Sequence, residues 1–371
     1  MKKFLIESRR LSELEDYKGR RVPEGDRAYI SPNYRQALLA NPFRPSYKVA
    51  CQKVGYVDGR IGGTEIQFPL KLSLNGQIVL GGSGSLTQVD EWARSSGLGL
   101  AISDVDYRDD SYNCVLGEGA GLSQIAVKVH KFIEYTVFEY PRFVMLLKSR
   151  SVVEMKLGSG LLASLVSHFA DGCIWIYAIF LGILARCIAR NPKVTQVEPS
   201  RNNDLAILES LAKTGLCQFS EVHDAQWFKW VLANSFSEQG SPTAFLVHDG
   251  DGPFGFFMVK KRFHEQASHR GFKNVWLGSV LEWGCKPGYD RELLWAIISW
   301  AMKSRKELDA VEFAAQEYHV QKFLKRLGWQ HVGDANFCFK ICPESGFVAP
   351  EGMSDPSNWR LRPGMGDVAL N

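Results

Sequence analysis

The pattern of apolar and polar positions predicts the same order of strands and helices twice along the chain. In the second occurrence, several strand-like runs precede a helix, a strand, a further helix and a last strand. The expected elements are strands near 243–247, 254–260 and 275–283, a helix over 292–303, a strand over 310–314 and a helix over 318–326. This order is typical of a mixed α/β fold.

The first occurrence begins with two strands, over 47–57 and 64–74, on either side of a glycine-containing turn. Asn75-Gly76 then predicts a hairpin, because a type I′ turn needs positive φ at both central residues. A third strand over 77–80 is expected to lead, through a Gly/Ser-rich stretch, to a helix that starts near Gly97. The two occurrences therefore share their coarse order.

Short segments recur at a nearly constant offset, which indicates an internal duplication. Asp58-Gly59 recurs as Asp251-Gly252, Leu100-Ala101-Ile102 as Trp295-Ala296-Ile297, and Phe132 to Tyr135 as Arg326 to Trp329. The offsets of 193, 195 and 194 residues are too long for a solenoid repeat. We therefore expect a duplicated domain.

These features divide the chain into five expected parts. They are an N-terminal extension of charged helices and loops over 1–45, a first domain over 46–150, a helical connector over 151–200, a second domain over 201–345, and an irregular tail over 346–371. The connector holds the longest apolar run, the 13 residues from Cys173 to Ala185. Because a membrane span needs about 20 such residues, this run predicts a buried helix and no membrane insertion.

Composition and charge are those of a soluble globular protein. Of the 371 residues 45% are hydrophobic, and 44 Lys and Arg stand against 40 Asp and Glu. No dense basic segment stands out, so nucleic acid is not an expected partner. The apolar stretch at 4–6 is too short for a signal peptide, and the eight cysteines lack any CxxC pair. Both observations favour a cytoplasmic protein with reduced thiols.

Arg94-Ser95-Ser96-Gly97-Leu98-Gly99 is the clearest candidate for ligand binding. It follows a predicted strand and opens a predicted helix, which is the context of a phosphate-binding loop. The glycines allow the backbone to approach an anion, and the N–H groups of the first helical turn then point at it. A dinucleotide site is not expected, because its glycines would follow the first strand of a βαβ unit. His319 and His331 have no His or Cys at ligand spacing, so no metal site is expected.

These residues resemble the GNAT superfamily of acyl-coenzyme A-dependent N-acyltransferases. The family pattern Arg/Gln-x-x-Gly-x-Gly/Ala is matched by Arg94 to Gly99, with Val89 in its usual place upstream. A second landmark, a helix closed by Gly-Phe, is similar to Ser123 through Tyr135, and the second copy ends in Gly328-Trp329. The resemblance implies an α/β fold with two GNAT-like domains, in which a mixed, largely antiparallel sheet is flanked by helices.

The resemblance also implies the donor and the residues that bind it. Acyl-coenzyme A (acyl-CoA) is the expected co-substrate, and no metal is implied. The implied cofactor-binding residues are Leu86, Thr87, Gln88, Val89, Arg94, Ser95, Ser96, Gly97, Leu98, Gly99, Leu100, Ser123 and Ala126.

The second copy departs from the family pattern in its glycine loop. The positions of Arg94, Gly97 and Gly99 there hold Tyr289, Glu292 and Leu294. A carboxylate and a bulky side chain oppose the approach of a pyrophosphate. We therefore expect the first domain to bind the donor, and the second, with its degenerate loop, to bind the acceptor or give support.

His130 stands where the family has a tyrosine that protonates the departing thiolate. An imidazolium could donate that proton, and a neutral imidazole could instead take the proton of the amine. His130 is therefore the candidate catalytic residue, and its alternative role is to line the pocket. Glu282 aligns with Thr87. It is either a base at a domain interface or a carboxylate at the surface end of a strand.

Fold does not define the substrate, so the acceptor is inferred from the arrangement of the whole chain. The tandem repeat with one degenerate copy, the N-terminal extension and the tail resemble N-acyltransferases of bacterial surface-polysaccharide (O-antigen) pathways. This implies direct attack by the amine of a nucleotide-linked sugar, a dTDP-3-amino-3,6-dideoxyhexose, on a 3-hydroxybutanoyl or acetyl thioester. Gly81, Gly82 and Gly84 are interpreted as making room for the longer acyl group.

Two other functions remain open at this point. One is an aminoacyl-tRNA-dependent transferase with two GNAT-like domains, which predicts a long helical hairpin and a basic face that the sequence does not show. The other is a tandem binding module without turnover. A homodimer is compatible with either function and with the transferase.

Overall fold

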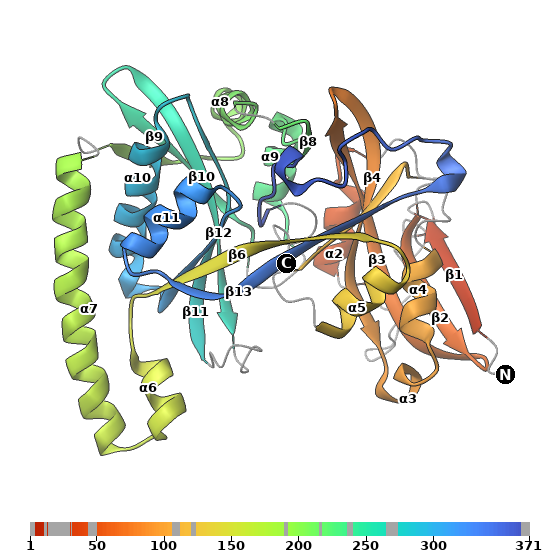
Figure 1. The fold of residues 1–371 in the computed structure, drawn as a ribbon, viewed down its shortest axis with the longest axis horizontal. Helices are drawn as coiled ribbons and strands as arrows, with labels where there is room; N and C mark the ends of the chain where they lie inside the picture. Colours follow the sequence, from red (N-terminus) through yellow and green to blue (C-terminus); the bar gives the residue numbers. More distant parts are fainter. Residues whose placement is uncertain are drawn as a thin grey trace.

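The computed structural model describes residues 4–10, 13, 30, 32–43, 50–105, 112–119, 124–188, 192–214, 217–235, 240–264 and 274–364. One 13-stranded sheet runs through the molecule, and helices cover it (Figure 1). The first part of the chain forms β1 Phe4–Arg10, α2 Pro32–Leu39, β2 Ala50–Val57, β3 Arg60–Leu74, β4 Gln77–Val89, α3 Glu91–Arg94, α4 Leu98–Val105, β5 Cys114–Gly119, α5 Gln124–Phe132 and β6 Thr136–Leu146.

The remaining elements form a connecting region and a second half. The connecting region contains α6 Arg150–Leu157, α7 Leu161–Ile188 and β7 Lys193–Gln196. The second half contains α8 Asn202–Ala212, β8 Phe219–Glu221, α9 Ala225–Ala233, β9 Thr243–Asp249, β10 Gly252–His264, β11 Val275–Cys285, α10 Asp290–Lys303, η3 Ser304–Lys306, β12 Ala310–Ala314, α11 Tyr318–Arg326 and β13 Gln330–Ile341. The strand over 310–314 and the helix over 318–326 have the predicted bounds.

The strand order shows that the two halves exchange their last strands. The order is β1-β2-β3-β4-β5-β13-β6-β12-β11-β10-β9-β7, and β8 pairs with β3. β13 of the second half pairs with β5 of the first, while β6 of the first half pairs with β12 of the second. The expected boundaries at 46–150 and 201–345 therefore separate sequence repeats and not independent sheets. Among the described strands, β4–β5 and β11–β12 are the parallel pairs.

Matching backbone details in the two halves support the internal duplication. The paired residues Gly84 and Gly117 correspond to the pair Ser279 and Glu312, at an offset of 195 residues for both. A β-bulge interrupts β4 opposite Glu65, and another interrupts β11 at the equivalent position. The turns that end α5 and α11 also match, because both contain a residue with a φ of 65° or 67°.

The predicted hairpin forms, but the strand that follows it is longer than expected. Asn75 and Gly76 have φ angles of 51° and 81°, as a type I′ turn requires. β4 then continues through the Gly/Ser-rich stretch, because β3 and β5 pair with it on either side. A Cβ atom at Gly81 or Gly82 would lie 2.8 Å from the side chain of Leu70 or Tyr112. The expectation that these two glycines make room for an acyl group is therefore wrong.

Alternate residues of each strand pack against opposite faces of the sheet. On β10, Phe256 belongs to a core shared by both halves, and Phe257 belongs to a second cluster with residues of α10 and α11. The shared core also contains side chains from α2, α8 and α9, together with Trp359 of the C-terminal segment. The tail expected to be irregular is thus partly buried and holds the halves together.

The N-terminal extension begins with a strand, so the expectation of helices over 1–45 is wrong in part. Residues Phe4–Arg10 form β1, which pairs antiparallel with β2. The open edge of β2 offers a row of backbone partners, and such tertiary pairing overrides local preference. The extension also contains a helix, α2.

The apolar run of the connector lies in one continuous helix, α7, and the expectation that this helix is buried is wrong. Leu161 is 82% exposed and Phe169 is 77% exposed. A narrow line of small side chains, including Ala163 and Ala185, makes the contact with the rest of the protein. Within the described ranges, α7 is the single helix long and apolar enough to cross a membrane. It runs along the outer edge of the molecule (Figure 1).

Candidate functional site

The parallel strands β4 and β5 of the first half pair over only part of their length, and we call the stretch beyond Gly84 and Gly117, where they no longer pair, the opening. β4 and β5 pair over Gly81 to Gly84 of β4, and beyond this point β4 continues to Val89. The β-bulge of β4 lies in this last part, and bulges re-aim backbone groups beside functional sites. Leu86, Thr87, Gln88 and Val89 therefore lie in the part of β4 that no longer pairs with β5.

The glycine loop lies between the end of β4 and the start of α4. Gly97 has a φ of 89°, a conformation that glycine adopts without strain. The Ser96 hydroxyl donates to the carbonyl of Ala93 at 2.5 Å and accepts the N–H of Leu98 at 3.2 Å, which holds the turn. The first N–H groups of a helix have no acceptor within it, so the start of α4 can bind an anion.

The other predicted donor-binding residues differ in how they are placed. Arg94 and Ser95 are exposed, and Arg94 donates from Nε to the carbonyl of Val89 at 3.3 Å. Leu98 is buried against β2 and β3, so its side chain anchors the loop and only its backbone is free for a ligand. Ser123 lies outside the described residues. Ala126 lies in α5, and its side chain is not among those described.

His130 lies in the last turn of α5, next to the start of β6. Its ring meets the ring of Tyr135 edge to face, with the centroids 4.9 Å apart. Tyr135 packs in turn with Leu100 of α4. The structure thus connects the candidate catalytic residue with the helix that begins at the glycine loop.

Sequence reasoning missed buried polar residues on the strands beside α4. Lys53 and Glu65 face each other across β2 and β3, and both are buried. Glu65 is close enough to Tyr135 for its charge to contribute to the raised pKa of that phenol, after burial and Cys338. The available signal was the placement of polar side chains in the middle of otherwise apolar strands, where a buried polar group needs a specific reason.

In the second half, the chain's own C-terminal segment fills the equivalent opening. The N–H of Gly364 donates to the carbonyl of Leu281 at 2.7 Å, on the bulge of β11. Arg360 donates to the carbonyl of Trp283 at 2.9 Å. In the part of the chain that the structure describes, no segment takes the corresponding place beside Leu86. The loop before α10 is also unsuited to an anion, because α10 carries the carboxylates of Asp290 and Glu292 in its first turn.

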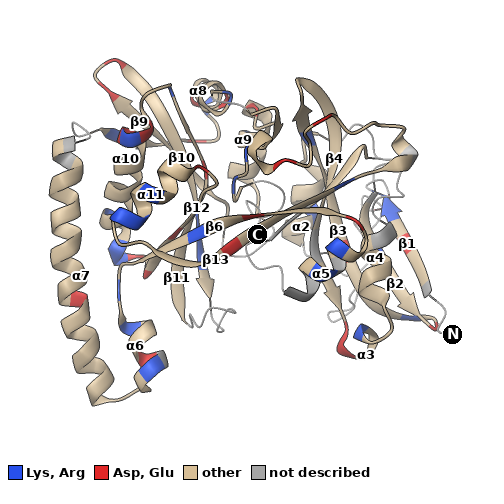
Figure 2. Ribbon diagram, in the orientation of Figure 1, with Lys and Arg blue, Asp and Glu red and all other residues tan. Residues whose placement is uncertain are grey.

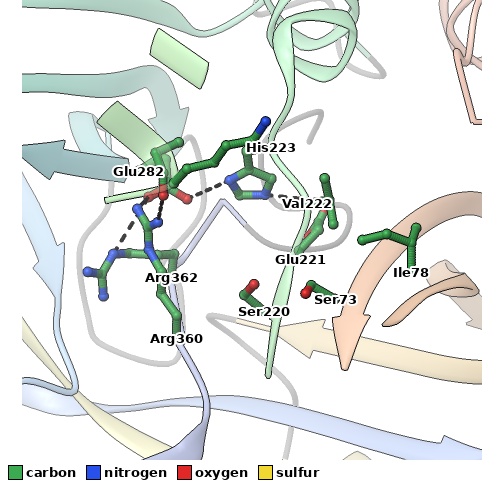
Figure 3. A pocket seen from close by; sticks show the side chains of 11 residues that line it. Ser73, Ile78, Ser220, Glu221, Val222, His223, Glu282, Arg360 and Arg362 are labelled. Carbon is green, nitrogen blue, oxygen red and sulfur yellow. Dashed lines mark hydrogen bonds and ion pairs between the residues drawn. The ribbon is translucent and has the colours of Figure 1, made fainter. Parts of the chain in front are cut away.

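Glu282 lies at the centre of a buried charge cluster between the halves (Figure 3). Its carboxylate contacts His223 Nδ1 at 2.7 Å and accepts a hydrogen bond from Arg360 Nη2 at 2.7 Å. Arg362 Nε is 3.6 Å away. The cluster borders a cavity of about 110 Å³ that Ile78 also lines. Glu282 is fully buried, so a surface carboxylate, one of its two expected placements, is wrong.

The cluster shifts the pKa values of its members in opposite directions. Burial lowers the pKa of His223, but the carboxylates of Glu221 and Glu282 outweigh burial and raise it to about 9. Burial raises the pKa of Glu282, and the charges of Arg360 and His223 outweigh it and lower that pKa to about 2. Both side chains are therefore charged at neutral pH.

These shifts predict how stability depends on pH. His223 has a raised pKa, so its contribution is complete below its ordinary value of 6.5 and is lost as pH rises through about 9. We expect the free energy of unfolding to fall by about 3 kcal/mol across that interval, and the fall to be absent in His223→Gln. Glu282 acts in the opposite sense, because its contribution is lost as pH falls from 4.5 towards about 2.

Urea titrations at pH 6, 7.5 and 9 would measure this dependence. His319→Gln is the matched control. His319 also lies near a carboxylate, but its side chain is 61% exposed and its contact with Asp290 is long, at 4.0 Å, so its charge should contribute little to stability. An equal fall in the wild type and in His223→Gln would show that His223 is not the titrating group.

The Glu282 cavity and the glycine loop lie at opposite ends of β4. Ile78, the second residue of β4, lines the Glu282 cavity, whereas Thr87 lies nine residues further along the strand. At a rise of about 3.3 Å per residue, this separation is about 30 Å. The structure therefore places α4 beside β4, connects His130 to α4 through Tyr135 and Leu100, and leaves Glu282 apart from them. Substrate binding by Glu282 stays a prediction.

Comparison with known proteins identifies the fold. The sequence matches no family model and no curated protein. The structure is similar to Saccharomyces cerevisiae N-myristoyltransferase with bound myristoyl-CoA, with a TM-score of 0.56 and 13% identity, over 91% of this chain and 82% of that one. It is also similar to a GCN5-related N-acetyltransferase from Anabaena variabilis, with a TM-score of 0.51 and 10% identity, over 92% and 73% of the two chains.

The class that these features define is the GNAT fold, built twice in one chain. Both solved structures are named as N-acyltransferases, and at these identities the likeness concerns the fold. The described residues contain no group of three or more His, Cys, Asp and Glu side chains placed to hold a metal ion.

Proposed function

We propose that this protein is an acyl-CoA-dependent N-acyltransferase that binds its donor in the opening between β4 and β5. The difference between the two halves carries this proposal. The first opening has glycines at its apex, Gly84 and Gly117, whereas the second has Ser279 and Glu312 there and is filled by the C-terminal segment. A protein that binds one donor molecule needs one such site. The opening is therefore expected to stay accessible in one copy and can be closed in the other.

The glycine loop supplies the place for the donor's pyrophosphate. The N–H groups at the start of α4, together with the positive end of its dipole, favour a double negative charge. Arg94 adds an exposed cation beside them. A similar structure was solved with myristoyl-CoA bound, which supports a coenzyme A thioester as the donor class.

The reaction is direct attack of an amine on the thioester. The amine nitrogen forms a C–N bond, the C–S bond breaks, the amine loses a proton and the departing thiolate gains one. The acyl oxygen becomes negative in the intermediate, and backbone N–H groups of the bulge near Leu86 are suited to stabilise it. The thiolate needs a proton donor whose pKa lies close to the working pH.

His130 fits the role of proton donor better than Tyr135. Burial, with the nearby Cys338 and Glu65, raises the pKa of Tyr135 well above its ordinary value of 10, which makes the phenol a weaker acid. An imidazolium has an ordinary pKa near neutrality. Tyr135 then serves to hold the imidazole ring, through their edge-to-face contact.

His130→Gln is therefore expected to lower kcat about 100-fold, with little change in the KM for acyl-CoA, because general acid catalysis contributes at least this factor. Tyr135→Phe keeps the ring contact and is expected to lower kcat less than tenfold. Steady-state kinetics of both variants would measure this. The reverse order of effects would assign the proton transfer to Tyr135.

The finer proposal is that the acceptor is a nucleotide-linked amino sugar, a dTDP-3-amino-3,6-dideoxyhexose, and that the acyl group is 3-hydroxybutanoyl or acetyl. It is supported by the resemblance of the tandem arrangement, with one degenerate glycine loop, to enzymes that modify such sugars. The Glu282 cavity between the halves borders charged side chains from both the second half and the C-terminal segment. Because it lies about 30 Å along β4 from the bulge where the thioester is attacked, it is the candidate place only for polar groups of the acceptor that are remote from the amine.

The test is release of coenzyme A from acetyl-, 3-hydroxybutanoyl- and myristoyl-CoA, with and without dTDP-3-amino-3,6-dideoxygalactose. Products are detected by mass spectrometry, because the protein's own eight cysteines react with thiol reagents. Sugar-dependent release supports both levels of the proposal. Coenzyme A binding without release overturns the sugar and keeps the donor, whereas absence of binding overturns the transferase.

A further inference from the structure

α7 presents an apolar surface that the rest of the protein leaves open. Its contact with the body is a seam of mostly small side chains, Ala163, Ser167, Ala178, Leu181 and Ala185. The other sides of the helix carry large apolar side chains that are 38% to 82% exposed. We call these the α7 face: Leu161, Leu162, Leu165, Val166, Phe169, Trp175, Ile176, Tyr177, Ile179, Phe180 and Ile183.

The α7 face is larger than a monomeric protein usually exposes to water. α7 has 28 residues and is therefore about 42 Å long. The α7 face extends along the helix from Leu161 to Ile183, and the residues between its members are mainly small or weakly polar. Large apolar patches of this kind mark interaction sites. Asp171 is the acidic residue within α7, and its carboxylate is turned to the body, where it accepts the N–H of Ser149 at 2.5 Å.

Basic side chains border the α7 face. In Figure 2 the ribbon of α7 carries little colour, while α6, α10 and α11 beside it carry Lys and Arg. Arg305 lies over the ring of Trp175, 5.9 Å from its centroid, and the Tyr177 hydroxyl donates to the carbonyl that follows α11. The exposed or half-exposed members of this basic border are Lys156, Lys303, Arg305, Lys306, Lys325 and Arg326, whereas Arg150 of α6 is neutralised by Glu154.

Most acidic side chains near this border are already paired. Glu154 pairs with Arg150 within α6, Asp309 pairs with Lys148, and Glu307 pairs with Lys261. The border therefore keeps a surplus of positive charge around an apolar centre. A surface of this kind complements an anionic layer that is polar outside and apolar beneath.

We propose that α7 docks the protein on the surface of a bilayer that contains anionic lipids, with the helix lying in the plane of the membrane. Its apolar side chains enter the boundary between headgroups and acyl chains, Trp175 and Tyr177 lie at headgroup level, and the basic border contacts lipid phosphates. The buried seam and the Asp171 contact hold α7 against the body, which favours this orientation over a spanning one.

A second copy of the chain fits the α7 face less well. Two copies joined through α7 would bring their basic borders together, and like charges at an interface oppose association. Lipid phosphates offer the opposite charge along the whole border. The same attraction makes the docking sensitive to salt.

Sedimentation with vesicles tests this proposal with the full chain. We expect binding to vesicles of phosphatidylcholine with 30% phosphatidylglycerol, and at least tenfold weaker binding to phosphatidylcholine alone or in 0.5 M NaCl. The double variant Phe169→Glu/Phe180→Glu is expected to bind at least tenfold more weakly, because both side chains are on the exposed face. The matched control is Val348→Glu, which changes an apolar residue that is 83% exposed on the C-terminal segment.

Four outcomes would overturn the proposal. Failure to bind the anionic vesicles would do so, and so would equal loss in Val348→Glu. A concentration-dependent dimer in sedimentation velocity, abolished by the double variant in the absence of lipid, would assign the face to a second copy. Retention of the bound protein in carbonate at pH 11 would overturn the in-plane orientation. None of these measurements uses acyl-CoA, so they do not depend on the proposed transferase activity.

Discussion

Glu282→Gln is expected to lower the free energy of unfolding by about 3–5 kcal/mol, because it leaves buried cations without their counter-charge. Glu282 is fully buried and accepts from Arg360 at 2.7 Å while contacting His223 at the same distance. Glutamine keeps the shape of the side chain, so the change removes charge without opening a cavity. Urea denaturation at pH 7 would measure the loss.

Glu154→Gln is the matched control for this experiment. Glu154 also pairs with an arginine, Arg150, but on the exposed side of α6. Such surface pairs contribute about 0–1 kcal/mol, so the control should scarcely change the unfolding transition. A loss below 1 kcal/mol in Glu282→Gln would contradict the view that this cluster holds the C-terminal segment and the two halves together.

Gly99→Leu is expected to weaken coenzyme A binding at least 100-fold, a loss of about 2.7 kcal/mol or more. It gives the first loop the residue that the second copy has at Leu294. A Cβ atom at Gly99 already meets Val89 at 3.3 Å, so a leucine side chain is forced towards the ligand side of the loop. Isothermal titration with coenzyme A would measure the dissociation constant.

Gly250→Leu controls for the general effect of replacing a glycine in a turn. A Cβ atom at Gly250 meets nothing within 4 Å, and this hairpin lies in the second half. Its dissociation constant for coenzyme A should equal that of the wild type. If Gly99→Leu also binds normally while remaining folded, the pyrophosphate does not lie at the start of α4.

Sequence patterns predicted the parts of the fold that depend on neighbouring residues. Asn75-Gly76 forms the predicted turn because its φ requirement is met by those two residues alone. The helix over 318–326 has one apolar stripe, and Val320 and Leu324 on that stripe are buried as helical periodicity predicts. The glycine loop was also found correctly between a strand and a helix, since its glycines and its position mark it locally.

Contacts between distant segments could not be predicted in this way. The exchange of β6 and β13 depends on which edges meet in three dimensions, and neither strand's sequence specifies its neighbour. The exposure of α7 was missed for a related reason. An apolar run predicts that a surface will be covered, but not that the rest of this chain leaves it open.

The same limit applies to the candidate site. Tyr135 contacts His130 and is influenced by Glu65, which is 70 positions earlier in the sequence. Glu282 had two expected placements, and only the position of the C-terminal segment decided between them, by bringing Arg360 to the carboxylate. Local motifs thus located the glycine loop, whereas the contacts of Tyr135 and Glu282 depend on how distant segments fold together.

The exchange of last strands has a consequence for synthesis of the protein. Domains generally fold in order as they leave the ribosome, the N-terminal one first. Here one edge of β5 can form its backbone hydrogen bonds only after β13, Gln330–Ile341, has been synthesised. The first half therefore stays incomplete, with an unpaired strand edge, until β13 has been translated. A nonsense mutation before residue 330 would disable this half even though its own residues had all been made.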